Sequence, residues 1–245
     1  MVFGLVLGAC APEDGGSPNT GTGGTPAAGG TSGAGATAGA ASATGGNPSP
    51  GTIDCRHEGD GKTTLVFVNR CARAVEYRGS DIPGGTLTPG AFACVDIGNA
   101  TDAISSKRYW GWVGTDPGGG HYTLAEFTFN TDFYDLDWYN ISHVDAHNLP
   151  MAIFPAARPN CRRLACPQDF LASCPAVGQF RDAQGNVVAC VSPNRDDPSN
   201  PVVLLFEQCD DAYAWSGDDQ NGTDPSPMVG CQFEDVDIEF CPEAP

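Results

Sequence analysis

The spacing of the cysteines constrains the fold of this chain more than any other feature. Ten of its eleven cysteines lie beyond residue 54, and none of them forms the C-x-x-C pair typical of zinc sites. An even number of widely spaced cysteines favours five disulfides formed in an oxidising compartment, so we expect an exported, crosslinked protein. The ten are Cys55, Cys71, Cys94, Cys161, Cys166, Cys174, Cys190, Cys209, Cys231 and Cys241.

The eleventh cysteine, Cys10, closes a short apolar run, MVFGLVLGAC. Small residues directly before a cysteine resemble a bacterial lipoprotein signal, in which the cysteine is lipidated after cleavage. An ordinary secretory signal with an incidental cysteine is the alternative, and a run of nine residues is too short to span a bilayer. Alanine follows Cys10 where an inner-membrane retention signal would place an aspartate. We therefore predict a lipoprotein signal over residues 1–10 and an anchor in the outer membrane or at the cell surface.

A long polar segment separates this signal from the rest of the chain. Residues 11–52 are mostly Gly, Ser, Thr, Ala, Pro and Asn, with no apolar periodicity. Such a segment buries too little apolar surface to offset its ordering entropy, and we interpret it as a flexible tether with a root-mean-square span of about 35 Å. Residues 53–245 then form the folded domain.

The folded part carries the pattern of an all-β domain. Short runs rich in β-branched and aromatic residues alternate with Gly, Pro, Asn and Asp, which is typical of a sandwich or barrel. A short helix is expected only between Cys161 and Cys174. The predicted strands are Thr63–Asn69, Ala72–Tyr77, Phe92–Ile97, Tyr109–Val113, Tyr122–Phe129 and Val202–Phe206.

The net charge excludes some partners. Thirty acidic residues against twelve basic ones give a formal charge of -18, which repels nucleic acid phosphates and anionic lipid. Solubility explains much of this acidity. We therefore expect no nucleic acid partner and no membrane contact other than the lipid on Cys10. The domain is further predicted to be a monomer without a cofactor.

Four motifs resemble the thaumatin-like proteins. They are TLVFVNRC, TLAEFTFN, WYNISHVDAHNLPM and the closing FCP, in the family's order from about Thr63 to Pro242. The resemblance implies a mainly β fold, namely a flattened β-sandwich beside a disulfide-rich loop region. It also implies the pairs Cys71–Cys241, Cys161–Cys231, Cys166–Cys209 and Cys174–Cys190, which leaves Cys55 for Cys94.

The same resemblance implies a cleft between the sandwich and the loop region. In many family members an Arg, a Glu and three Asp residues line this cleft, which is associated with binding and sometimes slow hydrolysis of β-1,3-glucans. Here Glu126, Asp145 and Asp218 match three of the five positions. Asn140 stands in place of the remaining aspartate, and Trp112 stands in place of the arginine.

These residues allow two kinds of chemistry. Glu126 and Asp145 are the predicted catalytic pair if the cleft hydrolyses a glucan, with one carboxyl as acid and the other as nucleophile or base. With Asn140 in place of an acid, less repulsion acts to raise the pKa of Glu126, so binding of sugar hydroxyls without hydrolysis is favoured. Trp112 would then stack on a sugar ring.

A second motif in the same segment suggests a metal site. His143, Asp145 and His147 share one face if the backbone is extended, and imidazole with carboxylate is a common transition-metal set. A turn before Asn148 would break that face, so no metal is the favoured prediction. The leading function is polysaccharide binding; the alternatives are weak β-1,3-glucanase activity and a structural or protein-binding surface domain.

Overall fold

The computed structural model describes residue 55 and residues 59–130, 135–221 and 226–243. These residues belong to one compact unit, Pro50–Pro245. The predicted signal, the tether and Cys10 lie outside the described residues.

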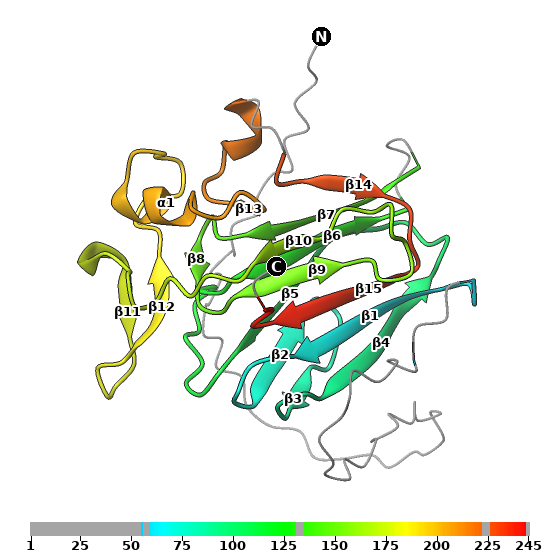
Figure 1. Ribbon diagram of the computed structural model, residues 1–245, viewed down its shortest axis with the longest axis horizontal. Helices are drawn as coiled ribbons and strands as arrows, with labels where there is room; N and C mark the ends of the chain where they lie inside the picture. Colours follow the sequence, from blue (N-terminus) through cyan, green and yellow to red (C-terminus); the bar gives the residue numbers. More distant parts are fainter. Residues whose placement is uncertain (1–54, 56–58, 131–134, 222–225, 244–245) are drawn as a thin grey trace, which may run out of the picture. The chain divides into compact units, whose positions relative to one another are not determined.

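The described part of the chain is mainly strand (Figure 1). Its strands are β1 (Lys62–Asn69), β2 (Val75–Gly79), β3 (Gly85–Leu87), β4 (Phe92–Asn99), β5 (Ile104–Trp112), β6 (Leu124–Phe129), β7 (Asp137–Ser142), β8 (Ala146–His147), β9 (Met151–Phe154), β10 (Leu164–Cys166), β11 (Gln179–Arg181), β12 (Val187–Val191), β13 (Ala212–Tyr213), β14 (Val229–Cys231) and β15 (Asp235–Phe240). A helix, α1 (Pro201–Phe206), and two 3₁₀ turns, η1 (Ala176–Gly178) and η2 (Asp218–Asn221), complete the order.

These strands form three sheets. One has the order β10-β9-β15-β1-β4, a second has the order β13-β7-β6-β5-β2-β3 with β14 also paired to β7, and a small third has the order β11-β12-β8. The first two sheets pack face to face and make the predicted sandwich, while β11, β12, η1 and α1 belong to the disulfide-rich region beside it (Figure 1). The fold class expected from the sequence is therefore confirmed.

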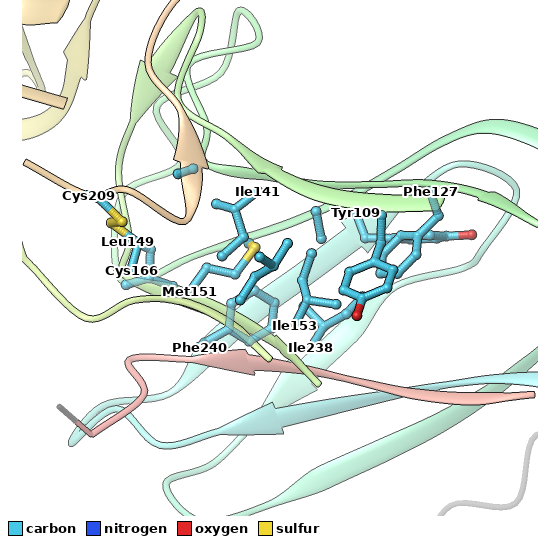
Figure 2. Close-up of a cluster of buried hydrophobic side chains, with 14 of the residues drawn as sticks. Tyr109, Phe127, Ile141, Leu149, Met151, Ile153, Cys166, Cys209, Ile238 and Phe240 are labelled. Carbon is cyan, nitrogen blue, oxygen red and sulfur yellow. A yellow bond between two sulfur atoms is a disulfide. The ribbon is translucent and has the colours of Figure 1, made fainter. Parts of the chain in front are cut away.

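The core lies between the two large sheets. Tyr109 and Phe127 project from the β13–β3 sheet toward Ile153 and Ile238 of the other sheet (Figure 2), and all four are buried. Alternation along each strand sends every second side chain into this layer. Each such side chain contributes about 1.5–3 kcal/mol when it leaves water.

Strand β1 is buried along almost its whole length, which explains its nearly continuous apolar sequence. It pairs in parallel with β15, from Thr64 opposite Asp235 to Asn69 opposite Phe240, and antiparallel with β4. The first and last strands of the domain are therefore neighbours. This places Cys71, just after β1, next to Cys241, just after β15.

The described residues contain five disulfides, of which four are the pairs that the family resemblance implies and the fifth, Cys55–Cys94, is the pair expected by elimination. The five are Cys55–Cys94, Cys71–Cys241, Cys161–Cys231, Cys166–Cys209 and Cys174–Cys190. The Cys71–Cys241 bridge spans 170 residues of sequence, with the two Cα atoms 5.0 Å apart. In the chain-entropy description a loop of that length removes about 5 kcal/mol of unfolded-state entropy.

Two secondary-structure predictions are wrong. Val202–Phe206, predicted as a strand from its apolar and β-branched residues, lies within α1. The Asn200 side chain accepts hydrogen bonds from the N–H groups of Val202 and Val203, and Pro201 supplies the fixed φ of the first helical position, so this capping outweighs propensity. The short helix expected between Cys161 and Cys174 is absent from that described segment, which holds β10 and turns. Among the described residues, no helix has the length and apolar character needed to cross a membrane.

Replacing Asn200 tests how far its buried side chain stabilises the disulfide-rich region. Besides capping α1, its amide donates to the carbonyl oxygen of Asn194 at 2.8 Å. Asn200→Ala should lower the free energy of unfolding by about 2 kcal/mol, because the two N–H groups of α1 and the Asn194 carbonyl lose this partner. Urea unfolding under non-reducing conditions measures this loss. Asn194→Ala, which removes an exposed side chain of the same turn, is the matched control; equal midpoints for the two variants would contradict the capping role.

Candidate functional site

The predicted site residues begin on the face of the β13–β3 sheet that points away from the core. Tyr109, Phe127 and Tyr139 are buried between the sheets, so their neighbours on β5, β6 and β7 point to the opposite face. On that face Arg108 is paired across the ladder with Glu126, and Glu126 with Asn140. Three adjacent strands therefore place a guanidinium, a carboxylate and an amide side by side.

Both oxygens of Glu126 are engaged in this row. The Nε atom of Arg108 lies 3.0 Å from one oxygen, and the Nδ2 atom of Asn140 donates to the other at 3.0 Å. Asn140, which stands in place of the family's aspartate, therefore holds the Glu126 carboxylate in position through this hydrogen bond. Arg108 was missed by the sequence analysis. It lies four residues before Trp112 on one strand, hence on the same face, and this spacing was the signal that could have revealed it.

Trp112 occupies the same face but offers little surface for stacking. Its side chain is only 8% exposed and belongs to a second apolar cluster with Tyr122 and Leu124. The Arg78 guanidinium lies over the indole, 5.5 Å from its centroid, and the Tyr122 ring lies 6.0 Å away. Trp112 therefore presents little free ring surface in this structure, because other side chains cover it, and its stacking on a sugar ring stays a prediction.

Asp145 has an arginine partner of its own. The Nη1 atom of Arg195 lies 2.9 Å from Asp145 Oδ1, and the two side chains are 38% and 43% exposed. The Arg195 carbonyl accepts a hydrogen bond from the N–H of Ser216, two residues before Asp218. Arg195 therefore links Asp145 to the segment that carries the third predicted carboxylate. Sequence analysis missed it because the two residues are fifty positions apart.

Asp218, the third predicted carboxyl, has a raised pKa. Burial raises the pKa and the negative charge of Asp219 adds to it, while a hydrogen bond from the Ala214 N–H, at 2.8 Å, opposes the shift. Burial also raises the pKa of Tyr213, and the charges of Asp219, Asp218 and Glu126 raise it further. Tyr213 therefore lies near both Glu126 and Asp218. We call Glu126, Asp145 and Asp218 the carboxylate set.

The two histidines of the H-x-D-x-H motif do not join Asp145. His143 and His147 are completely buried, with His147 Nδ1 3.3 Å from His143 Nε2 and the rings edge to face. Asp145, between them in sequence, turns outward to Arg195. Within the described residues no three His, Cys, Asp or Glu side chains form a group able to hold a metal ion. The bend after β7 breaks the shared face that the metal hypothesis required.

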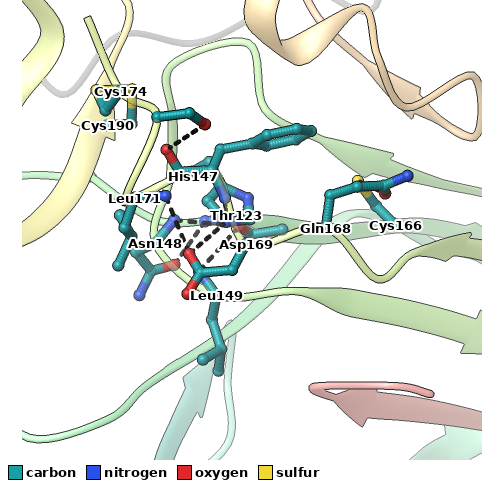
Figure 3. A network of polar contacts seen from close by, with 12 residues as sticks. Thr123, His147, Asn148, Leu149, Cys166, Gln168, Asp169, Leu171, Cys174 and Cys190 are labelled. Carbon is teal, nitrogen blue, oxygen red and sulfur yellow. Dashed lines mark hydrogen bonds and ion pairs between the residues drawn. A yellow bond between two sulfur atoms is a disulfide. The ribbon is translucent and has the colours of Figure 1, made fainter. Parts of the chain in front are cut away.

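A buried polar network holds the segment around Asp145 in place (Figure 3). Asn148 Oδ1 accepts the N–H of Thr123 at 2.9 Å, and Asn148 Nδ2 donates to the Gly111 carbonyl at 2.9 Å. The Thr123 hydroxyl lies 3.3 Å from His147 Nδ1, and the Phe170 N–H donates to His147 Nε2 at 3.4 Å. The network therefore connects the end of β5, the start of β6 and the disulfide-rich region.

Two surface depressions lie away from these residues. One, of about 420 Å³, is lined by residues that include Asp81, Asp96 and Lys107, and the other, of about 440 Å³, by residues that include Arg158 and Gln232. Neither contains a member of the carboxylate set.

The comparisons with known proteins agree with the motifs. The model of the thaumatin family matches residues 114–242, more than half of the chain, so the chain belongs to the thaumatin family. Pathogenesis-related thaumatin-like protein 3.7 of Cryptomeria japonica is 34% identical over 74% of this chain and 89% of that protein. A protein of Prunus avium named glucan endo-1,3-beta-glucosidase is 32% identical over 41% of this chain and 49% of its own length. The solved structure of the thaumatin-like xylanase inhibitor TLXI covers 73% of this chain at 16% identity, with a TM-score of 0.36.

The buried histidine pair predicts acid sensitivity. Burial lowers the pKa of His143 to about 3 and that of His147 well below its ordinary value, with His143 adding to the latter shift. Below pH 6.5 the unfolded state binds more protons than the folded state, so stability is lost as the pH falls toward 3. By pH 5 protonation of His143 should by itself remove about 2 kcal/mol of stability, and His147 adds to this loss.

The variant His143→Gln isolates this effect, because an amide can still meet His147 and does not titrate. Unfolding free energies between pH 7.5 and 4.5 should fall less steeply in this variant than in the wild type. His121→Gln is the control, since burial lowers the pKa of His121 but the charge of Asp145 opposes that shift. Parallel pH profiles for wild type and His143→Gln would show that the buried pair does not govern acid sensitivity.

Proposed function

We propose that the chain is an exported domain that binds a polysaccharide of the β-1,3-glucan type at the carboxylate set. The observation that carries the proposal is the pair of arginine–carboxylate contacts, Arg108–Glu126 and Arg195–Asp145, on partly exposed side chains. Guanidinium groups donate and carboxylates accept in fixed directions, and alternating donors and acceptors suit the hydroxyls of a sugar. Membership of the thaumatin family and the name of the Prunus avium relative, glucan endo-1,3-beta-glucosidase, support a β-1,3-glucan as the ligand.

The contacts of Glu126 and Asp145, the predicted catalytic pair, favour binding without hydrolysis. A glycosidase needs one carboxyl group that donates a proton to the leaving oxygen. Glu126 instead forms an ion pair with Arg108 and accepts a hydrogen bond from Asn140, and Asp145 forms an ion pair with Arg195. Neither member of the pair is arranged as a proton donor.

Weak β-1,3-glucanase activity is the second candidate, and one observation favours it. Burial raises the pKa of Asp218, as a general acid requires. If the domain hydrolyses a glucan, Asp218 then acts as the acid, and Glu126 or Asp145 as the nucleophile or base. The sequence-based pair of Glu126 and Asp145 would in that case have to be revised.

The proposal extends to the placement of the domain. Five disulfides are typical of proteins that fold in oxidising compartments. We propose further that lipid on Cys10 anchors the protein to a bacterial outer membrane or cell surface, that residues 11–52 act as the tether, and that the domain is a monomer. A tether would let the domain search for polymer at a distance from the membrane.

Laminarin, a neutral β-1,3-glucan, tests the binding proposal. A pulldown with wild-type protein should retain the polymer, and Glu126→Gln should weaken retention at least about tenfold, because a charge-assisted acceptor is lost. Asp96→Asn is the matched control, since Asp96 is also paired, with Lys62 at 2.7 Å, but on the other large sheet. A reducing-sugar assay on the same samples separates the candidates. New reducing ends that the wild type produces and Asp218→Asn does not would establish hydrolysis. If the wild type neither retains the polymer nor produces reducing ends, the structural or protein-binding alternative remains.

The anchor is tested separately. When the full chain is produced in a Gram-negative host fed radiolabelled palmitate, the wild type should carry label and sediment with membranes. Cys10→Ser should lose the label and move to the soluble exported fraction, because the acceptor thiol is gone. A wild-type protein that exports without label would rule out the lipoprotein interpretation.

A further inference from the structure

One exposed aromatic side chain lies on the small sheet whose strand β8 begins directly after Asp145. Among the described residues, four large apolar side chains are strongly exposed: Phe92, Val177, Phe180 and Leu204. Only Phe92 and Phe180 present an aromatic ring. Phe92 starts β4 at the edge of the other large sheet, whereas Phe180, which is 36% exposed, lies on β11 in the disulfide-rich region.

His121 connects Phe180 to the site. The two rings lie 4.5 Å apart between centroids, with their planes tilted by 54°. The negative charge of Asp145 acts on the same histidine and raises its pKa against the lowering effect of burial. The backbone brings the same segments together, because Phe180 pairs with Ala189 of β12 and the N–H of Ser192, just after β12, donates to the Asp145 carbonyl at 2.9 Å. We call Phe180, His121, Asp145 and Arg195 the ring subsite.

The ring subsite is rigidly supported. Phe180 is paired with Ala189 of β12, and its neighbour Gln179 is paired with Cys190, which forms a disulfide with Cys174. The Gln179 side chain also donates to the Cys174 carbonyl at 2.8 Å. Because β12 is itself paired with β8, which begins directly after Asp145, the strand that carries Phe180 and the segment that carries Asp145 are joined by backbone pairing. A preorganised platform of this kind binds without a large ordering cost.

We propose that Phe180 is the stacking platform of a pyranose-binding subsite, in which Asp145, Arg195 and His121 contact the hydroxyls of the ring stacked on Phe180. This inference rests on the proposed polysaccharide-binding function and names the residue that recognises the apolar face of the sugar. A pyranose has one face rich in C–H groups, which suits an aromatic ring, and a rim of hydroxyls, which suits paired donors and acceptors. Phe180 is assigned the stacking role in place of Trp112, whose ring is covered by Arg78 and Tyr122.

The charge of the site selects a neutral ligand. The two arginines are already paired with Asp145 and Glu126, and Asp218 and Asp219 lie close by. With a formal charge of -18 on the whole chain, an approaching uronic acid polymer is repelled. The ring subsite therefore fits a neutral glucan chain and discriminates against carboxylated ones.

Calorimetric titration with laminarin tests this subsite. Phe180→Ala and Phe180→Leu should each raise the dissociation constant about tenfold, because both remove the aromatic face, while Phe180→Tyr should keep wild-type affinity. The leucine variant retains apolar bulk beside His121, so its loss reports stacking and not a folding defect. Val177→Ala, a change at a 62% exposed apolar side chain two residues before Gln179, is the control and should leave affinity unchanged.

The outcomes separate the subsite from the broader function. A wild-type protein that does not bind laminarin overturns the proposed function itself. Wild-type binding that Phe180→Ala and Phe180→Leu leave unchanged keeps the function but overturns the ring subsite. Polygalacturonate bound as tightly as laminarin overturns the selection of a neutral ligand. Tenfold losses in both variants, recovery with tyrosine and no binding of polygalacturonate support the whole inference.

Discussion

The buried hydrogen bonds of Asn148 are the constraint on which the site depends. They tie the ends of β5 and β6 to the segment that carries Asp145, at positions where the backbone groups cannot reach water. An unpaired amide or carbonyl in that location would cost about 1–3 kcal/mol, so the segment has one stable position relative to the sheet. The sandwich and the disulfide-rich region are therefore joined by polar contacts, and the side chains between them are placed with little freedom.

The charged side chains of the site are arranged as local ion pairs. The family's arginine position holds Trp112, yet Glu126 still meets a guanidinium, because Arg108 lies on the same face of the same strand. Asp145 finds a second arginine in the disulfide-rich region. Glu126 and Asp145 therefore each have a neighbour that offsets the negative charge. Asp218 has an acidic neighbour instead, and its pKa is raised.

Much of the fold could be predicted because its determinants are local. Strand β1 is a short apolar run between turn residues, and the TLAEFTFN motif marks β6 by simple alternation. The strand predicted at Val202–Phe206 failed because Asn200 and Pro201 cap a helix, and propensity is the weaker effect there. The acidic members of the site followed from the family motifs. Arg195 and Phe180 did not, because they approach Asp145 and His121 only through tertiary packing.

The parallel pairing of β1 with β15 also governs how the domain is made. When the chain is synthesised or exported from its N-terminus, β1 emerges long before its partner strand β15, because Thr64 pairs with Asp235. Until then β1 lacks one partner strand, and Cys71 has a free thiol that can react with the wrong cysteine. Contacts so distant in sequence slow folding and expose unpaired strand edges. The cell that makes this protein therefore has to protect a nearly complete chain, and thiol–disulfide exchange has to correct early crosslinks before the last strand arrives.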